Sequence, residues 1–231
     1  MENKKTIILG LTAAIFLAGI VWFAGKYGQD IMSQTASVLG SSGEEQSAGE
    51  ILADEFFLGS PDAPVTIIGY SGHFCGHCAN FHNNTLPLIM DEYIKSGQVK
   101  FAPRLLSPSE LGIAVLCAQE QGGFSEFNGY LFKNGKEISA VIKNARELNI
   151  EIVEAITDYL KKTAGVLELD QDKFNLCFDS GTYIGSVEKW FEQAREAGVE
   201  GTPTFFINGK QIVGNQPYSV FKSAIEEALK E

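Results

Sequence analysis

The sequence predicts an α/β fold in which a long helical insertion interrupts a small sheet. Three observations predict it: a strand–helix–strand pattern over residues 64–104, a run of helical segments over residues 111–197, and a strand–strand–helix pattern over residues 204–229. Hydrophobic residues make up 45% of the 231 positions, which is enough for one substantial buried core. The formal net charge of -11 argues against nucleic acid as a partner.

Before the α/β region, residues 6–25 form an uncharged apolar stretch, TIILGLTAAIFLAGIVWFAG. A helix of these 20 residues spans about 30 Å, the thickness of the hydrocarbon core of a bilayer. Two lysines precede the stretch, one follows it, and Trp22 is placed as an interfacial aromatic residue. We therefore expect residues 1–27 to hold a short cytoplasmic stub and a transmembrane anchor. A cleaved signal peptide is the alternative, although no small-x-small cleavage site directly follows the apolar stretch.

Residues 28–50 are rich in Gly, Ser, Gln and Glu, and have the composition of a flexible linker. A chain of this kind and length has an r.m.s. reach of roughly 25 Å. We expect it to tether a folded domain over residues 51–231 to the membrane.

The first half of the predicted sheet surrounds one helix. Residues 64–70, PVTIIGY, are short, apolar and β-branched, as in a buried strand. Apolar residues then recur at helical spacing over residues 78–93, and Gly97 ends the helix. Pro87 lies inside this helix and is expected to kink it. Residues 99–104 form a second strand, so the unit predicts parallel pairing.

Helical patterns fill the region between the two halves of the sheet. They cover residues 111–121, 124–132, 138–148, 152–162, 171–178 and 182–197. Two short strands follow at residues 204–207 and 210–213. Asn208 and Gly209 separate them, and this dipeptide favours a type I′ hairpin turn. A last amphipathic helix is predicted over residues 217–229.

The stretch HFCGHCANFH, residues 73–82, holds two of the four cysteines and all three histidines. Cys75 falls where the first helix begins, and the free N–H groups and positive dipole end of a helix favour a thiolate there. Cys78 lies one turn further on the same face, as the resolving thiol of a Cys-x-x-Cys pair. A protonated His77 would add positive charge beside Cys75. Strand, motif and helix in this order indicate a redox pair.

A metal site is the alternative interpretation of the same stretch. Cys75, Cys78 and one or two of His73, His77 and His82 are possible ligands for zinc or copper(I). Structural zinc sites usually gather ligands from two segments, and the chain has no second Cys/His cluster. We therefore predict neither a metal nor a cofactor. His73 is expected to be an exposed loop residue near a substrate groove, and His82 a surface or partly packed helix residue.

The Cys-Gly-His-Cys motif, the kinked helix, the helical insertion over about 108–197 and the Gly201-Thr202-Pro203-Thr204 segment together resemble the DsbA-like branch of the thioredoxin superfamily. The resemblance covers residues 51–231, and within the branch it is to membrane-tethered bacterial proteins. It implies a thioredoxin-like fold in which a cis Pro203 packs against the active-site sulfurs. It also implies that Thr202 helps set the redox character, and that Thr202, Phe74 and Gly76 contact the substrate.

The resemblance bears on the other two cysteines as well. Cys117 and Cys177 lie 60 positions apart in the insertion, and the family often pairs cysteines in comparable places. A disulfide closing that loop would stabilise the fold by about 4 kcal/mol in the chain-entropy treatment. Two buried free thiols remain the alternative.

One position departs from the family pattern. Thioredoxin-like proteins commonly carry a buried acid six positions before the first cysteine, and Gly69 stands there. Proton transfer at Cys78 would then need water or another group.

The expected function is that of a membrane-anchored dithiol oxidase outside the cytoplasm, at the cell surface or in a periplasm. It would introduce disulfides into reduced or unfolded secreted proteins through Cys75 and Cys78, and a membrane redox partner would reset the pair. A disulfide reductase or isomerase is the alternative within the enzyme class. A thiol-based metal-binding module or metal chaperone is the alternative outside it.

Overall fold

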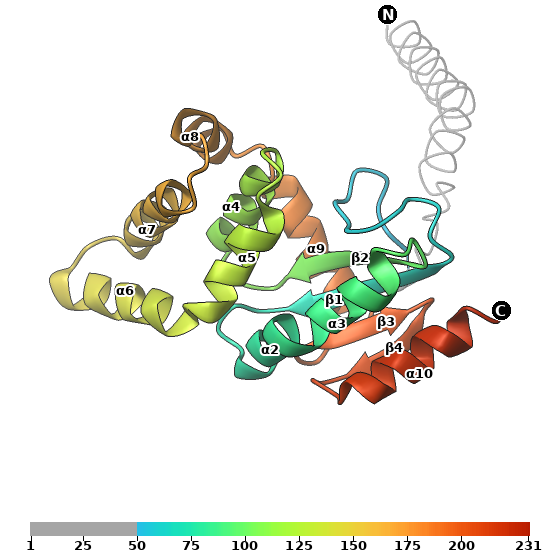
Figure 1. Ribbon diagram of the computed structural model, residues 1–231. Helices are drawn as coiled ribbons and strands as arrows, with labels where there is room; N and C mark the ends of the chain where they lie inside the picture. The colour runs from blue at the N-terminus through green and yellow to red at the C-terminus, as the bar shows by residue number, and fades with distance from the viewer. Residues whose placement is uncertain (1–49) are drawn as a thin grey trace, which may run out of the picture. The chain divides into compact units, whose positions relative to one another are not determined.

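The computed structural model describes residues 50–231, which form one compact unit of the chain (Figure 1). The predicted transmembrane anchor and all but the last residue of the predicted linker lie outside the described residues. Within residues 50–231, no helix combines the length and the apolar character needed to cross a bilayer.

The sheet has four strands in the order β2-β1-β3-β4. They are β1 (Val65–Ser71), β2 (Val99–Leu105), β3 (Thr204–Ile207) and β4 (Lys210–Val213). β1 and β2 pair in parallel as predicted, whereas β3 runs antiparallel to both β1 and β4. Asn208 and Gly209 have φ values of 44° and 82°, as a type I′ turn requires. The hairpin thus forms at the predicted dipeptide.

Pro103 lies in the middle of β2, where it has no N–H to donate to a ladder. It is tolerated because β2 is the outer strand of the order, with β1 on one side only. On the other side, Leu58 and Phe101 form an isolated bridge with reciprocal N–H···O bonds of 2.8 Å. The segment before β1 therefore covers part of this sheet edge.

The helix after β1 is continuous but irregular. It runs through α2 (Gly76–Asn80), the π-helical η1 (Phe81–Thr85), α3 (Leu86–Ile89) and the π-helical η2 (Met90–Ile94). Pro87 stands in the first turn of α3, and the N–H of Leu86 donates to the carbonyl of Phe81, five residues back. The wider π-type turn accommodates a proline that cannot make the ordinary helical bond. The structure thus shows π-type hydrogen bonding around Pro87, and the predicted kink stays a prediction.

Helices pack on both faces of the sheet. Figure 1 shows α3 and α10 (Tyr218–Ala228) on one face and α9 (Ile184–Glu196) on the other. The core between the sheet and the helices α3 and α10 is the first hydrophobic layer. In it the ring centroids of Phe81 and Phe205 lie 4.2 Å apart. Burial of one such side chain stabilises the folded state by roughly 1.5–3 kcal/mol relative to leaving it exposed. The first layer also includes Val65, Ile67, Ile89, Val99, Phe101, Phe221 and Ile225. The second layer is formed by Ile68, Tyr70, Ala102, Ala194 and Phe206.

Between β2 and β3 the chain is helical. The helices are α4 (Ser109–Gln119), α5 (Phe124–Lys133), α6 (Gly135–Leu148), α7 (Ile152–Val166), α8 (Gln171–Ser180) and α9. Residues 111–118 of α4 are all buried, because this helix has no polar face and its neighbours surround it. A disulfide joins Cys117 of α4 to Cys177 of α8, with the two Cα atoms 5.7 Å apart.

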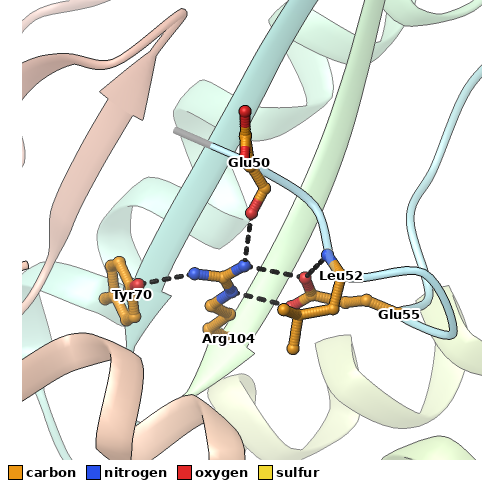
Figure 2. A network of polar contacts seen from close by, with 5 residues as sticks. All are labelled: Glu50, Leu52, Glu55, Tyr70 and Arg104. Carbon is orange, nitrogen blue, oxygen red and sulfur yellow. Dashed lines mark hydrogen bonds and ion pairs between the residues drawn. The ribbon is translucent and has the colours of Figure 1, made fainter. Parts of the chain in front are cut away.

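A buried ion pair holds the segment that leads into the domain (Figure 2). Arg104 of β2 donates from Nε and Nη2 to the two carboxylate oxygens of Glu55, at 2.7 and 2.8 Å. Its Nη1 donates to the hydroxyl of Tyr70 at 2.6 Å, and its Nη2 also donates to the carbonyl of Glu50. Both charged side chains are at most 2% exposed. Such a pair is tolerated in the interior because its hydrogen-bonding capacity is used.

Candidate active site

Cys75 lies in the turn between β1 and α2, as the N-cap residue of α2. Its backbone is extended, with φ -94° and ψ 116°, so the Sγ atom turns back over the start of the helix. The N–H of Cys78 donates to this sulfur at 3.4 Å. A sulfur thus occupies the place that Ser or Asp oxygen usually takes at an N-cap. Cys75 is half-buried and accessible to a second thiol.

The immediate surroundings of Cys75 favour its ionised form. Burial by itself would raise the pKa of this thiol. Hydrogen bonds from the Cys78 thiol, the Cys78 backbone N–H, the Thr202 side chain and the His77 backbone N–H outweigh it, so the pKa of Cys75 lies below its usual value. His77 itself is exposed on α2.

Cys78 is the opposite kind of thiol. It is fully buried, and the N–H of Gly72 donates to its sulfur at 3.4 Å. Burial raises the pKa of Cys78 to about 12, and the neighbouring Cys75 adds to the rise. The pair therefore consists of one half-buried sulfur that ionises readily and one fully buried sulfur that stays protonated.

The segment before β3 lies opposite this pair. The Thr202–Pro203 peptide bond is cis. The Sγ of Cys75 donates to the carbonyl of Thr202 at 3.3 Å, across 127 positions of sequence. Only the thiol can make this bond, because a thiolate has no proton to give. Pro203 is buried and Thr202 is half-buried beside the sulfur.

A cavity of about 550 Å³ adjoins Cys75. Its lining includes two aromatic side chains that remain exposed, Phe74 at 43% and Phe191 at 42%. The lining residues are Gly72, Phe74, Cys75, Leu106, Ser107, Pro108, Ser109, Phe191 and Thr202. The structure thus places Thr202 and Phe74, two of the three predicted substrate contacts, around one cavity. The third, Gly76, is exposed at the start of α2 and is absent from the cavity lining.

The predicted exposure of His73 is wrong. Its side chain is buried, with Nδ1 2.9 Å from the hydroxyl oxygen of Ser107 and Nε2 2.9 Å from Oδ1 of Asn128. The prediction treated the active-site loop as solvent-exposed, whereas α5 and the β2–α4 loop cover it. Burial lowers the pKa of His73 to about 4.

His82 is also buried, which excludes the helix-surface position, one of its two expected environments. It points inward from η1, with Nε2 3.3 Å from the hydroxyl oxygen of Ser71. Its ring stacks on Phe132 of α5 at 3.8 Å between centroids. Burial lowers the pKa of His82 to about 3, and His73 contributes to the shift.

Sequence reasoning missed Ser107, Asn128 and Phe191. A signal existed for Ser107: residues that follow two neighbouring parallel strands meet at the same edge of the sheet. Ser107 follows β2 as Cys75 follows β1, and the N–H of Leu106 donates to the carbonyl of Ser71 at 2.7 Å. Asn128 and Phe191 lie within helices, where nothing in the local pattern distinguishes them.

Gly69 has no room for the acid that the family commonly carries there. A Cβ atom at this position would lie 2.8 Å from the ring of Phe101 and 3.2 Å from that of Phe205. Aromatic side chains occupy the space instead. Glu55 is enclosed elsewhere beside the sheet, but its carboxylate is committed to Arg104.

Among residues 50–231, no group of three or more His, Cys, Asp or Glu side chains is arranged to bind a metal ion. Two of the possible ligands, His73 and His82, point their ring nitrogens at neighbouring polar side chains. The arrangement suits thiol chemistry at Cys75.

Comparisons with known proteins agree with this geometry. The thioredoxin family model matches residues 52–227. Disulfide bond formation protein D of Bacillus subtilis is 26% identical over 180 residues, which are 75% of this chain and 76% of that protein. The crystal structure of oxidised BdbD from Bacillus subtilis covers 80% of this chain and 98% of its own, with a TM-score of 0.63 and 22% identity. For alpha-DsbA1 of Wolbachia pipientis the TM-score is 0.64 at 22% identity, over 78% of this chain and 93% of that one.

The fold and the match over residues 52–227 show that the chain belongs to the thioredoxin family. Within it, the helical insertion and the Cys75–Cys78 site are those of a DsbA-like thiol-disulfide oxidoreductase.

Proposed function

We propose that the protein is a dithiol oxidase that introduces disulfides into reduced secreted proteins. The observation that carries the proposal is the contrast between the two sulfurs. Cys75 caps a helix and has a lowered pKa, whereas Cys78 is buried beneath it with a raised one. Stabilising the thiolate of the reduced form makes the disulfide form a stronger oxidant.

In the first step, a substrate thiolate attacks Sγ of Cys75 in the Cys75–Cys78 disulfide. The bond between the protein sulfurs breaks, a mixed disulfide forms, and Cys78 leaves with the electron pair. Because the pKa of Cys78 is about 12, this sulfur then takes a proton. Gly69 offers no carboxyl group for that proton, so we assign its delivery to water or to the substrate thiol.

In the second step, another substrate thiolate attacks the substrate sulfur of the mixed disulfide. Cys75 leaves as a thiolate, which its hydrogen bonds at the helix start stabilise. Two electrons have then passed from the substrate to the protein, and the substrate holds a disulfide. His77 is proposed to add charge beside the thiolate, and the cis Pro203 to keep the Thr202 carbonyl opposite the sulfur.

We further propose that the domain works outside the cytoplasm, tethered by an anchor at residues 6–25, and that a membrane redox partner reoxidises it. The uncharged 20-residue stretch supports the anchor. The Cys117–Cys177 disulfide supports an oxidising compartment, because structural disulfides are rare in the cytosol. The relatives named for disulfide bond formation support the oxidative direction.

Two measurements test the proposal. Cys78→Ser should trap mixed disulfides with substrate proteins through Cys75, and Cys75→Ser, the matched control, should trap none. The reduction potential of the pair then decides the direction. A potential well above that of thioredoxin, about -270 mV, supports an oxidase. A potential near that value, with the pair reduced in cells, would instead assign a reductase or isomerase.

A further inference from the structure

We propose that His73 is a positioning residue, which fixes the active-site loop against the helical insertion and thereby sets the ionisation of Cys75 and the oxidising strength of the pair. The proposal rests on thiol-disulfide exchange at Cys75 and Cys78. It does not depend on the direction of electron flow.

The hydrogen bonds of His73 define the state of its ring. Because Oδ1 of Asn128 can only accept, Nε2 of His73 donates to it at 2.9 Å. In a neutral ring Nδ1 is then the acceptor, so the Ser107 hydroxyl donates to it at 2.9 Å. The Ser107 oxygen in turn accepts from the backbone N–H of His73 at 2.8 Å. Every polar atom of the imidazole is therefore paired, as burial requires.

These contacts join the loop to parts of the chain that are distant in sequence. Ser107 lies in the β2–α4 loop, 34 positions from His73, and Asn128 lies in α5, 55 positions away. The ring of Phe132 in α5 is 4.4 Å from the imidazole. At the start of α6, a Cβ atom on Gly135 would lie 2.7 Å from the carbonyl oxygen of His73, so only glycine permits this close approach. The insertion thus holds both the side chain and the backbone of His73.

The backbone of Gly72, directly before His73, contacts the sulfur of Cys78 and the backbone N–H of Cys75. The N–H of Gly72 donates to Sγ of Cys78, and the carbonyl of Gly72 accepts from the N–H of Cys75 at 3.0 Å. Displacement of His73 would move these groups and loosen Cys75 over the helix start. The Cys75 thiolate is stabilised by N–H groups at fixed positions. It would therefore lose more stabilisation than the thiol form. The pKa of Cys75 should then rise toward its usual value.

Three variants test this role. His73→Ala removes both ring contacts, Asn128→Ala removes one, and His73→Gln keeps a donor and an acceptor in the side chain. Thr163→Val is the matched control, because Thr163 is also buried in the insertion and donates to the carbonyl of Tyr159 at 2.9 Å within α7. The readouts are the pKa of Cys75 from ultraviolet thiolate absorbance, the redox equilibrium with glutathione, and the free energy of unfolding.

We expect His73→Ala to raise the Cys75 pKa by about half a unit and to shift the glutathione equilibrium about threefold toward the disulfide form. Asn128→Ala should shift the Cys75 pKa and the glutathione equilibrium in the same direction by less. His73→Gln should bring both values part of the way back to those of the wild type. Thr163→Val should lower stability and leave both readouts unchanged. If His73→Ala does not fold, Asn128→Ala carries the test.

The outcomes separate the two proposals. If wild-type Cys75 has a lowered pKa that His73→Ala and Asn128→Ala leave in place, while stability falls, His73 has only a structural role and the inference is overturned. If wild-type Cys75 titrates as an ordinary thiol and Cys78→Ser traps nothing, the proposed function fails, and the inference fails with it.

Discussion

The backbone N–H of Cys78 donates to the sulfur of Cys75 at 3.4 Å, so the reactive sulfur is itself the cap of its helix. At a preferred N-cap residue, such as Ser or Asp, a side-chain oxygen accepts this bond. Here the capping contact strengthens when the sulfur is ionised, because a charged acceptor binds the N–H more strongly. Helix geometry and redox chemistry are therefore linked through one atom.

The first prediction concerns the pH dependence of Cys75. Its pKa is lowered, so reduced protein should react with an alkylating agent at pH values where an ordinary thiol is protonated. Cys78→Ala removes the thiol that donates to Cys75 and should move the midpoint of the alkylation rate to higher pH. Cys78→Ser keeps a donor and should stay closer to wild type. Coincident midpoints for the two variants would contradict a role for that hydrogen bond.

The second prediction concerns the buried pair of Arg104 and Glu55. Glu55→Ala leaves a buried guanidinium without its partner and should lower the free energy of unfolding by about 3–5 kcal/mol. The double variant Glu55→Leu/Arg104→Met removes both charges and should cost much less. Asp91→Ala breaks an ion pair with Lys95 whose side chains are about 70% exposed, and should cost less than about 1 kcal/mol. Urea denaturation measures all three.

The third prediction concerns the Cys117–Cys177 disulfide. In a Cys75→Ser/Cys78→Ser background, replacing both cysteines by alanine should lower the free energy of unfolding by about 4 kcal/mol, because the disulfide closes a loop of 60 residues. A reductant should destabilise the background protein by a similar amount. It should have no effect on the variant that also lacks Cys117 and Cys177. An equal response of both proteins to the reductant would contradict the assignment.

The fourth prediction concerns Gly69. Gly69→Ala places a Cβ atom against the ring of Phe101 and should lower stability by about 1–3 kcal/mol. The same change in a Phe101→Leu background should cost less, which a double-mutant cycle would detect as coupling. Gly129→Ala, on α5 with no atom within 4 Å of its Cβ position, is the control and should be neutral or stabilising. Additive effects at Gly69 and Phe101 would refute the steric explanation.

Most of the fold could be predicted from the sequence, because the signals are local. The β-branched run at β1, the Asn-Gly turn and the helical periodicities each depend on neighbouring residues, and the structure confirms the parallel pairing of β1 and β2. The start of α6 at Gly135 was missed, since none of the three residues before Ile138 has an apolar side chain. The π-type turns around Pro87 were missed as well, because only the absence of the proline N–H could be read from the sequence.

Local sequence patterns predicted the site only where its residues lie in one segment. Thr202 and Pro203, far along the chain from Cys75, followed from the family resemblance alone. Cys75 and Cys78 could be identified from their position after a strand. The environment of His73 could not, because its partners come from 34 and 55 positions away and a lone histidine gives no sign of burial. Phe191 lines the cavity only because α9 lies over the sheet.

If the domain is tethered through its N-terminal side as proposed, the contacts of Arg104 have a mechanical consequence. Glu50 is the first residue that the structure describes, and the guanidinium holds its carbonyl and the carboxylate of Glu55 to β2 (Figure 2). A force applied to the chain before Glu50 would therefore act first on the contacts of Arg104 with Glu50 and Glu55. The loop at Cys75 is held by other contacts, so the force would not reach it until the contacts of Arg104 had broken.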